Sequence, residues 1–203
     1  MALKLKDGLT LYFARHGQTG ANVEKRFQGH SKDTPLTAKG IAQARDVGAI
    51  LRDQTPFAAL EFVCSPLKRA QITMEIVRDV LGLPVDGFCT DERLSEINLG
   101  AFDGLTDAEA KQRFPKEYAA RQADKWNVNV PGGGENYASV ARRVSAFVAN
   151  LERDTFAVSH GAATRILRGL FQDLSWQQMS ALDEPQGCVF RVRGNVVERL
   201  DPA

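Results

Sequence analysis

The chain has 203 residues, of which 43% are apolar and 25% are charged, as in ordinary soluble globular proteins, and this length favours one domain with a sizeable core. The 26 basic and 25 acidic residues give a formal net charge of +1. This balance argues against a nucleic-acid or membrane partner, because both usually require a strong basic excess.

The beginning of the chain does not resemble a targeting segment. Residues 1–8, MALKLKDG, lack the apolar core of a signal peptide. No window in the sequence approaches the roughly 18 consecutive apolar residues of a membrane helix. We therefore expect a cytoplasmic protein with no membrane partner.

The first half of the chain alternates between short apolar runs, typical of buried strands, and longer stretches with helical spacing. Thr37 can cap one helix, Ser65 can cap another, and Pro66 suits the first turn of the second helix. The predicted elements are a strand over 9–14, a helix over 37–51, a strand over 58–64, a helix over 66–81 and a weak strand over 85–88.

The second half begins with short helical pieces and ends with a hairpin. Pro131 and the three glycines after it predict a loop, and Gly194-Asn195 marks the turn of the hairpin. The predicted elements are helical pieces over 107–113 and 118–123, helices over 140–151 and 161–170, and strands over 155–159, 189–192 and 196–200.

This alternation is typical of an α/β protein with a mainly parallel sheet. We expect a three-layer sandwich, with helices flanking a central sheet, as a single domain over residues 1–203. In such sheets, ligands bind where the strands end at their carboxyl side. Three predicted strands end in polar residues, namely Arg15-His16-Gly17, Ser65-Pro66 and Ser159-His160-Gly161. The sequence therefore predicts one cleft shared by these strand ends.

Two of the three histidines, His16 and His160, directly follow a predicted strand and precede a glycine. A glycine there lets the backbone turn sharply and bring its N–H groups toward a ligand. A single histidine is more often a structural residue than a catalyst, but the repeated position favours a functional pair. His30 lies in a polar loop and lacks this context.

These residue types suit phosphoryl transfer, which needs a nucleophile in line with the leaving oxygen and positive charge around the phosphoryl oxygens. A neutral imidazole can attack phosphorus, and its reference pKa near ~6.5 leaves it largely unprotonated at about pH 7. Arg15 and Arg69 are suitable phosphate clamps, because a guanidinium group binds phosphate bidentately. The alternative interpretation is that Arg69 is a solvated arginine on a helix surface, with no role in binding.

Further sequence blocks extend this pattern over nearly the whole chain. They are residues 11–22, residues 26–29, residues 35–37 with Gly40, residues 65–70, residues 94–97 with Gly100 and Gly104, residues 133–135 and residues 159–161. In type and order, these blocks resemble branch 1 of the histidine phosphatase superfamily, the phosphoglycerate-mutase-like family. One Arg-His-Gly tripeptide would be weak support, whereas an ordered series of blocks is strong support.

The resemblance implies a reaction through a phosphohistidine. His16 would attack the phosphoryl group, and a protonated His160 would help to neutralise its charge. Asn22 would donate a further hydrogen bond to the phosphate. The implied catalytic residues are His16, Glu96, His160, Arg15 and Arg69. The implied phosphate-binding residues are Arg15, Asn22, Arg69, His160 and Gly161.

The resemblance also implies that Glu96 protonates the leaving oxygen and then activates water. Glu96 lies between Leu94 and Ile97, apolar residues that could anchor it. Glu92 is the second choice for this acid. Glu135 could hydrogen-bond the backbone of the site, but stabilisation of a helix N-terminus explains it equally well.

The residues that select the substrate are less defined by the sequence. The specificity candidates are Arg26, Phe27, Gln28 and Gly29, and further loop candidates are His30, Phe102 and Trp126. Trp126 is more typical of a packing residue.

We expect neither a metal nor a cofactor. The widely spaced Cys64, Cys89 and Cys188 form neither a disulfide framework nor a zinc pattern. The triple glycine at 132–134 is not followed by the Lys-Ser/Thr of a nucleotide-binding loop. The expected partner is a small-molecule phosphate ester, and the oligomeric state is left open.

Three functions are compatible with this sequence. A phosphatase that hydrolyses small phosphate esters is favoured, because the chain ends directly after its last predicted strand, whereas mutases of the family tend to carry a longer tail. The alternative is a cofactor-dependent phosphoglycerate mutase that uses the same intermediate. A non-catalytic phospho-ligand-binding protein is disfavoured, because such proteins typically lack a nucleophile or clamp residue and this chain has both.

Overall fold

The computed structural model describes residues 2–30, 33–54 and 56–202. Its centre is a six-stranded sheet with the order β3-β2-β4-β1-β5-β6. The strands are β1 (Thr10–Arg15), β2 (Glu61–Cys64), β3 (Cys89–Thr90), β4 (Thr155–Ser159), β5 (Val189–Arg193) and β6 (Val196–Leu200). Strands β3, β2, β4 and β1 run parallel, and β5 and β6 add an antiparallel hairpin beside β1.

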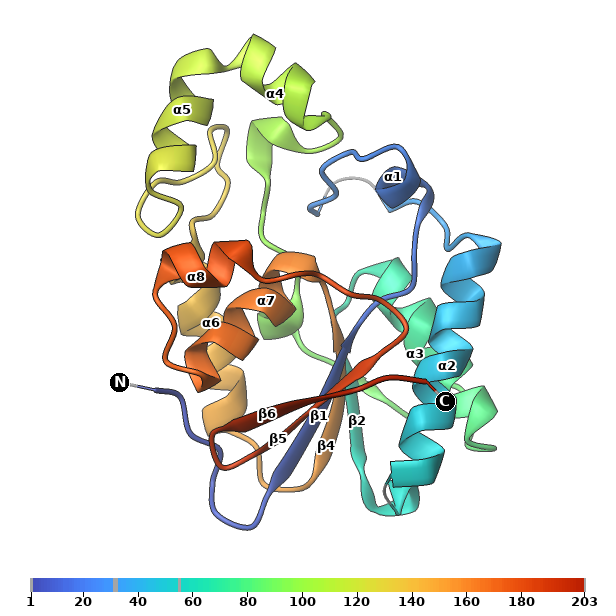
Figure 1. Ribbon diagram of the computed structural model, residues 1–203. Helices are drawn as coiled ribbons and strands as arrows, with labels where there is room; N and C mark the ends of the chain where they lie inside the picture. Colours follow the sequence, from blue (N-terminus) through green and yellow to red (C-terminus); the bar gives the residue numbers. More distant parts are fainter. Residues whose placement is uncertain (1, 31–32, 55, 203) are drawn as a thin grey trace.

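Helices cover both faces of this sheet (Figure 1). They are α1 (Gly20–Val23), α2 (Ala38–Gln54), α3 (Lys68–Val80), α4 (Asp107–Arg113), α5 (Pro115–Ala123), α6 (Tyr137–Ala149), α7 (Gly161–Phe171) and α8 (Trp176–Ala181). Short 3-10 helices occupy Phe57–Ala59, Glu92–Leu94 and Gly100–Phe102. The expected α/β architecture is confirmed, with a sheet that is mixed because of the final hairpin.

The central strand β1 shows why the protein has two apolar layers. Successive side chains of a strand point to opposite faces of the sheet. Leu11 and Phe13 therefore join the core formed with α6 and α7, while Tyr12 and Ala14 join the core formed with α2 and α3. A strand buried on both sides must be apolar at every position, as this run is.

Two predicted strands differ from the structure. Residues 85–88 form a turn, in which the Gly87 and Phe88 N–H groups donate to the carbonyls of Pro84 and Asp86, and the strand follows at β3. The prediction of a strand over 85–88 is therefore wrong. The strand predicted over 58–64 is shortened to β2, because its first residues belong to the 3-10 helix that precedes it.

Two helix starts also differ. The predicted cap at Ser65 is wrong: α3 begins at Lys68, and Ser65 Oγ accepts the Leu67 N–H in a local turn. Helix α5 begins three residues before the predicted piece at 118, because Pro115 favours the first helical position. Helices α1 and α8 were not anticipated, although both start with capping boxes.

Gly48 provides a test of the packing between α2 and α3. A Cβ atom added there would lie 2.8 Å from Val80 Cβ, which is too close for an ordinary contact. In an isolated helix, glycine to alanine stabilises by about 1 kcal/mol. We expect Gly48→Ala instead to lower the free energy of unfolding by about 1–3 kcal/mol in urea titrations, because the two helices must move apart.

The matched control is the double variant Gly48→Ala/Val80→Ala, which makes room for the new methyl group. It should recover most of the lost stability. If Gly48→Ala alone stabilised the protein, the close approach of α2 and α3 would not be a constraint on the fold.

Candidate active site

Strand register brings the two histidines of the repeated motif together. In the parallel pairing of β1 and β4, Arg15 lies opposite Ser159, and the His16 N–H donates to the Ser159 carbonyl at 3.0 Å. The next residue on β4 is His160, and the two imidazole centres lie 5.1 Å apart. The predicted meeting of His16 and His160 is therefore present.

His16 is held in the form that a nucleophile requires. Its Nδ1 lies 2.8 Å from the Gly17 carbonyl, which can only accept, so Nδ1 carries the proton and Nε2 the lone pair. Arg69 Nε donates to this Nε2 at 3.3 Å. Burial lowers the pKa of His16 well below its ordinary value, and the charges of Arg15 and Arg69 lower it further. The imidazole is thus neutral at neutral pH.

His160 lies next to His16 and is fully buried. Its Nε2 is 2.6 Å from Ser65 Oγ, and its Nδ1 has no hydrogen-bond partner among the described residues. Burial lowers the pKa of His160 well below the ordinary value, and the nearby Arg69, His16 and Arg15 add to this effect. The cations around His160 thus oppose its protonation, and the protonated form that we expect opposite a phosphate dianion stays a prediction.

Both Arg15 and Arg69 lie near enough to His16 for their charges to act on it. Arg69 is 1% exposed, so it is not the solvated surface residue of the alternative reading. Its guanidinium group donates to Asp33 Oδ1 at 2.6 Å and to the Gly29 carbonyl at 2.9 Å. Arg15 donates to the Glu184 carbonyl at 2.7 Å. Both guanidinium groups are thus oriented by oxygen atoms of the protein itself.

Glu96 lies at the N-terminus of α7. Its carboxylate accepts hydrogen bonds from the Ile97 N–H at 2.8 Å and from the Ala162 and Ala163 N–H groups at 3.2 Å each. Burial raises the pKa of Glu96, and the nearby negative charge of Glu184 raises it further. A carboxyl group with a raised pKa retains its proton to higher pH, as a general acid requires.

The other acid candidates lie elsewhere. Glu92 is exposed, does not line the cavity and accepts a hydrogen bond from the Ser95 hydroxyl at 3.3 Å. Glu135 accepts from the Asn98 N–H at 2.9 Å and binds Arg143, so it holds the backbone of the loop that carries Glu96.

Two further residues support the same loop. Arg143 donates to the carbonyls of Ser95 and Glu96, and His30 Nε2 contacts the Glu96 carbonyl. His30 therefore lies against the backbone of the acid loop and not in the cavity lining.

Asn22 lines the cavity, whereas Gly161 is a buried residue at the start of α7 that does not line it. The Asn22 amide oxygen accepts from the Thr19 N–H and from Gln186 Nε2, both at 3.2 Å, which leaves the amide nitrogen as the end that can donate to a phosphate. At Gly161, an added Cβ atom would lie 2.4 Å from Glu184 Oε2, so a larger residue would displace that side chain.

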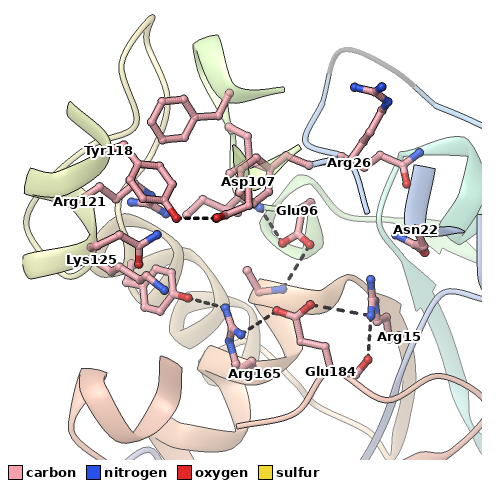
Figure 2. A pocket seen from close by; sticks show the side chains of 18 of the residues that line it. Arg15, Asn22, Arg26, Glu96, Asp107, Tyr118, Arg121, Lys125, Arg165 and Glu184 are labelled. Carbon is pink, nitrogen blue, oxygen red and sulfur yellow. Dashed lines mark hydrogen bonds and ion pairs between the residues drawn. The ribbon is translucent and has the colours of Figure 1, made fainter. Parts of the chain in front are cut away.

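A cavity of about 340 Å³ opens beside these groups and is drawn in Figure 2. Arg15, His16, Asn22 and Glu96 line it, whereas the buried His160 and Arg69 do not. Of the specificity candidates, Arg26, Phe27 and Gln28 line the cavity. Gly29 does not, and its carbonyl instead binds Arg69. Phe102 lines the cavity too, while Trp126 packs against the core.

Several residues of the cavity were not anticipated from the sequence. They are Asp107, Tyr118, Arg121, Lys125, Tyr137, Arg165 and Glu184. Glu184 forms ion pairs with Arg15 at 3.8 Å and with Arg165 at 3.0 Å. The sequence could have predicted a place for Arg165 near the site. Arg165 follows Gly161 by four residues, about one helical turn, and therefore lies on the same face of the helix. The others carry no local signal, since a charged helix surface has the same composition.

The described ranges carry neither a metal-binding cluster nor a membrane-spanning helix. Within them, no group of three or more histidine, cysteine, aspartate or glutamate residues could hold a metal ion. Within the same ranges, no helix has the length and apolar character needed to cross a membrane.

Known proteins are similar to this chain over most of its length. Adenosylcobalamin/alpha-ribazole phosphatase of Escherichia coli K12 is 30% identical over 185 residues, which cover 89% of this chain and 87% of that protein. The 6-phosphofructo-2-kinase/fructose-2,6-bisphosphatase of Gallus gallus is 29% identical over 184 residues and 90% of this chain. The chain spans only 37% of the length of that second relative.

Solved structures agree with the sequence comparison. A putative alpha-ribazole-5'-P phosphatase from Escherichia coli K-12 superposes with a TM-score of 0.81 and 25% identity, covering 97% of each chain. A mycobacterial glucosyl-3-phosphoglycerate phosphatase superposes with a TM-score of 0.75 and 26% identity, covering 96% of this chain and 99% of that one. Proteins named as phosphatases thus share both the sequence and the fold.

A family model confirms the resemblance that the sequence blocks indicated. The model of the histidine phosphatase superfamily, branch 1, matches residues 11–196, which include both histidines, both arginines and the acid loop. The chain belongs to branch 1 of the histidine phosphatase superfamily.

Proposed function

We propose that this protein hydrolyses small phosphate monoesters through a phosphohistidine formed on His16. The observation that carries the proposal is the environment of His16, whose Nε2 lone pair lies beside Arg69, next to a cavity that Glu96 also lines. The family and its phosphatase-named members support the same activity.

The first half-reaction forms the intermediate. His16 Nε2 attacks phosphorus, the bond between phosphorus and the ester oxygen breaks, and protonated Glu96 gives its proton to the leaving oxygen. Arg15 and Arg69 stabilise the negative charge on the phosphoryl oxygens, since both guanidinium groups lie near His16 and are held by protein oxygen atoms. Asn22 donates a further hydrogen bond to these oxygens.

The second half-reaction releases phosphate. The Glu96 carboxylate takes a proton from water, whose oxygen attacks phosphorus, and the bond between phosphorus and His16 breaks. Orthophosphate leaves, and Glu96 is again protonated. His160 and the N-terminus of α7 at Gly161 add positive electrostatic potential behind the phosphoryl group, because a bound dianion favours the protonated imidazole.

Hydrolysis is favoured over the two other functions considered. A phosphoglycerate mutase uses the same intermediate but returns the phosphoryl group to a bound acid, and the relatives that match most of this chain are named as phosphatases. A non-catalytic binding protein would not need a neutral histidine and a carboxyl group of raised pKa at one cavity. Cytoplasmic location, independence from cofactors and the absence of a nucleic-acid partner stay predictions.

Replacement of His16 tests the nucleophile. We expect His16→Asn to reduce kcat on any phosphate monoester on the order of 10⁴-fold or more, because no phosphoenzyme can form. Rapid quenching of the wild-type protein with substrate should yield an acid-labile phosphoryl group on the peptide that contains His16. If a folded His16→Asn protein kept activity within about tenfold of wild type, His16 would not be the nucleophile.

Glu96 is tested by the leaving group. We expect Glu96→Gln to slow alkyl phosphates by about 10²–10⁴-fold and aryl phosphates much less, because an aryl oxide leaves without full protonation. Steady-state kinetics on glycerol 3-phosphate and p-nitrophenyl phosphate measure the difference. Glu92→Gln is the matched control and should leave both rates unchanged. Equal slowing of both esters by Glu96→Gln would exclude Glu96 as the acid.

The pH dependence of kcat/KM follows from the two shifted groups. Activity should fall at low pH as His16 gains a proton, and this limb should lie below the ordinary pKa of histidine because burial lowers the pKa of His16. Activity should fall again at higher pH as Glu96 loses its proton, and this limb should lie above the ordinary pKa of a carboxyl group. With an alkyl phosphate, Glu96→Gln should abolish the alkaline limb and retain the acid limb. An unchanged alkaline limb would assign it to another group.

A further inference from the structure

Glu184 is an acidic residue of the cavity that has no step in the proposed reaction. It lies in the loop between α8 and β5, and it lines the same cavity as His16 and Arg15. Its carboxylate lies between two arginines, with Oε1 3.0 Å from Arg165 Nη1 and Oε2 3.8 Å from Arg15 Nη1, as Figure 2 shows. A cavity proposed to bind phosphate therefore holds a carboxylate beside one of its phosphate-binding arginines.

Glu184 Oε2 also lies beside the residue at which α7 begins. A Cβ atom added to Gly161, the first residue of this helix, would lie too close to Glu184 Oε2 for an ordinary contact and 3.3 Å from Arg15 Nε. Oε2 and Arg15 Nε therefore both lie next to Gly161. The N-terminus of a helix carries a partial positive charge that attracts anions. A phosphoryl group bound by Arg15 and by the start of α7 would need the space that this carboxylate occupies.

The contact between the Glu184 carboxylate and Arg15 is loose. The separation of 3.8 Å between Oε2 and Nη1 is longer than a hydrogen bond. Arg15 Nε is buried and has no hydrogen-bond partner among the described residues. A buried donor without a partner is unfavourable, and a guanidinium group can bind an oxyanion through two N–H groups at once. Arg15 thus retains a donor that a phosphate can use and that Glu184 does not.

The backbone of Glu184 is fixed without help from its carboxylate. The preceding residue, Asp183, accepts hydrogen bonds from Arg168 at both its carbonyl and its Oδ1. The Glu184 carbonyl itself accepts from Arg15 Nη1 at 2.7 Å. Replacement of the carboxylate therefore leaves this anchor of Arg15 in place and removes only the negative charge beside it.

We propose that the Glu184 carboxylate competes with the phosphoryl group for Arg15 and the start of α7, and thereby weakens the binding of orthophosphate, the product that must leave. This rests on the proposed phosphatase function. The physical basis is the repulsion between two anions that approach the same cation in a partly buried site. Arg165 remains as a partner for the carboxylate while a phosphate occupies Arg15.

Binding of orthophosphate to two variants tests the competition. Isothermal titration calorimetry of Glu184→Gln and of Glu184→Ala should give a Kd for orthophosphate about 10-fold lower than that of wild type, because a repelling charge is removed. In the hydrolysis of p-nitrophenyl phosphate, the competitive inhibition constant of orthophosphate should fall by a similar factor. Tighter binding by Glu184→Gln alone would assign the gain to the new amide N–H groups and would overturn the competition.

Asp183→Asn is the matched control. It removes the same charge one residue away, on a side chain that lies outside the cavity lining and pairs with Arg168 and Arg199. Its Kd for orthophosphate should stay within about twofold of wild type, because salt at about 0.15 M screens charges that are exposed and more distant. An equal gain in Asp183→Asn would assign the effect to net charge and would overturn the role of Glu184.

Two further outcomes separate the two proposals. Unchanged or weaker binding of orthophosphate by both folded Glu184 variants would overturn the competition, because the carboxylate would then serve to position the arginines. No phosphate release from p-nitrophenyl phosphate by wild type would overturn the proposed function. The calorimetric titration with orthophosphate needs no turnover, so it tests Glu184 in either case.

Discussion

The parallel pairing of β1 with β4 is the interaction on which the candidate site depends. Its ladder runs from Leu11 opposite Thr155 to Arg15 opposite Ser159, and the His16 N–H extends it by one hydrogen bond. Parallel strands end at the same edge of a sheet, so the residues that follow them emerge side by side. A register shift of one residue would reverse the face of every apolar side chain on the strand, so the two buried cores maintain the meeting of the histidines.

The positively charged side chains of the site are held in place by groups from other parts of the fold. Burial and the arginines beside them lower the pKa of both imidazoles. Arg69 is satisfied by Asp33 and the Gly29 carbonyl, and Arg15 by the Glu184 carbonyl. These oxygen atoms hold the guanidinium groups in place before a phosphate arrives, and such preorganisation is the main source of electrostatic catalysis.

The sheet and the peripheral helices make different contributions to the cavity. The sheet edge and the loop of Glu96 supply the groups proposed to react, and they are held by β-ladders and buried hydrogen bonds. Helix α5 and the turn after it supply the opposite wall, and Figure 1 shows α4 and α5 standing beyond the end of the sheet. Side chains on that wall can differ without disturbing the ladder, which explains how one fold accommodates relatives named for different substrates.

Local patterns in the sequence determined the strands that carry the histidines, the main helices, the final hairpin and the family, because apolar periodicity and ordered motifs are properties of neighbouring residues. The tertiary structure alone decided that Ser65 contacts His160 and caps no helix, and that burial lowers the pKa of His160. It alone also placed Lys125 and Glu184 in the cavity. A pKa and a cavity wall depend on charge and burial contributed by residues distant in the chain, and no local pattern records those distances.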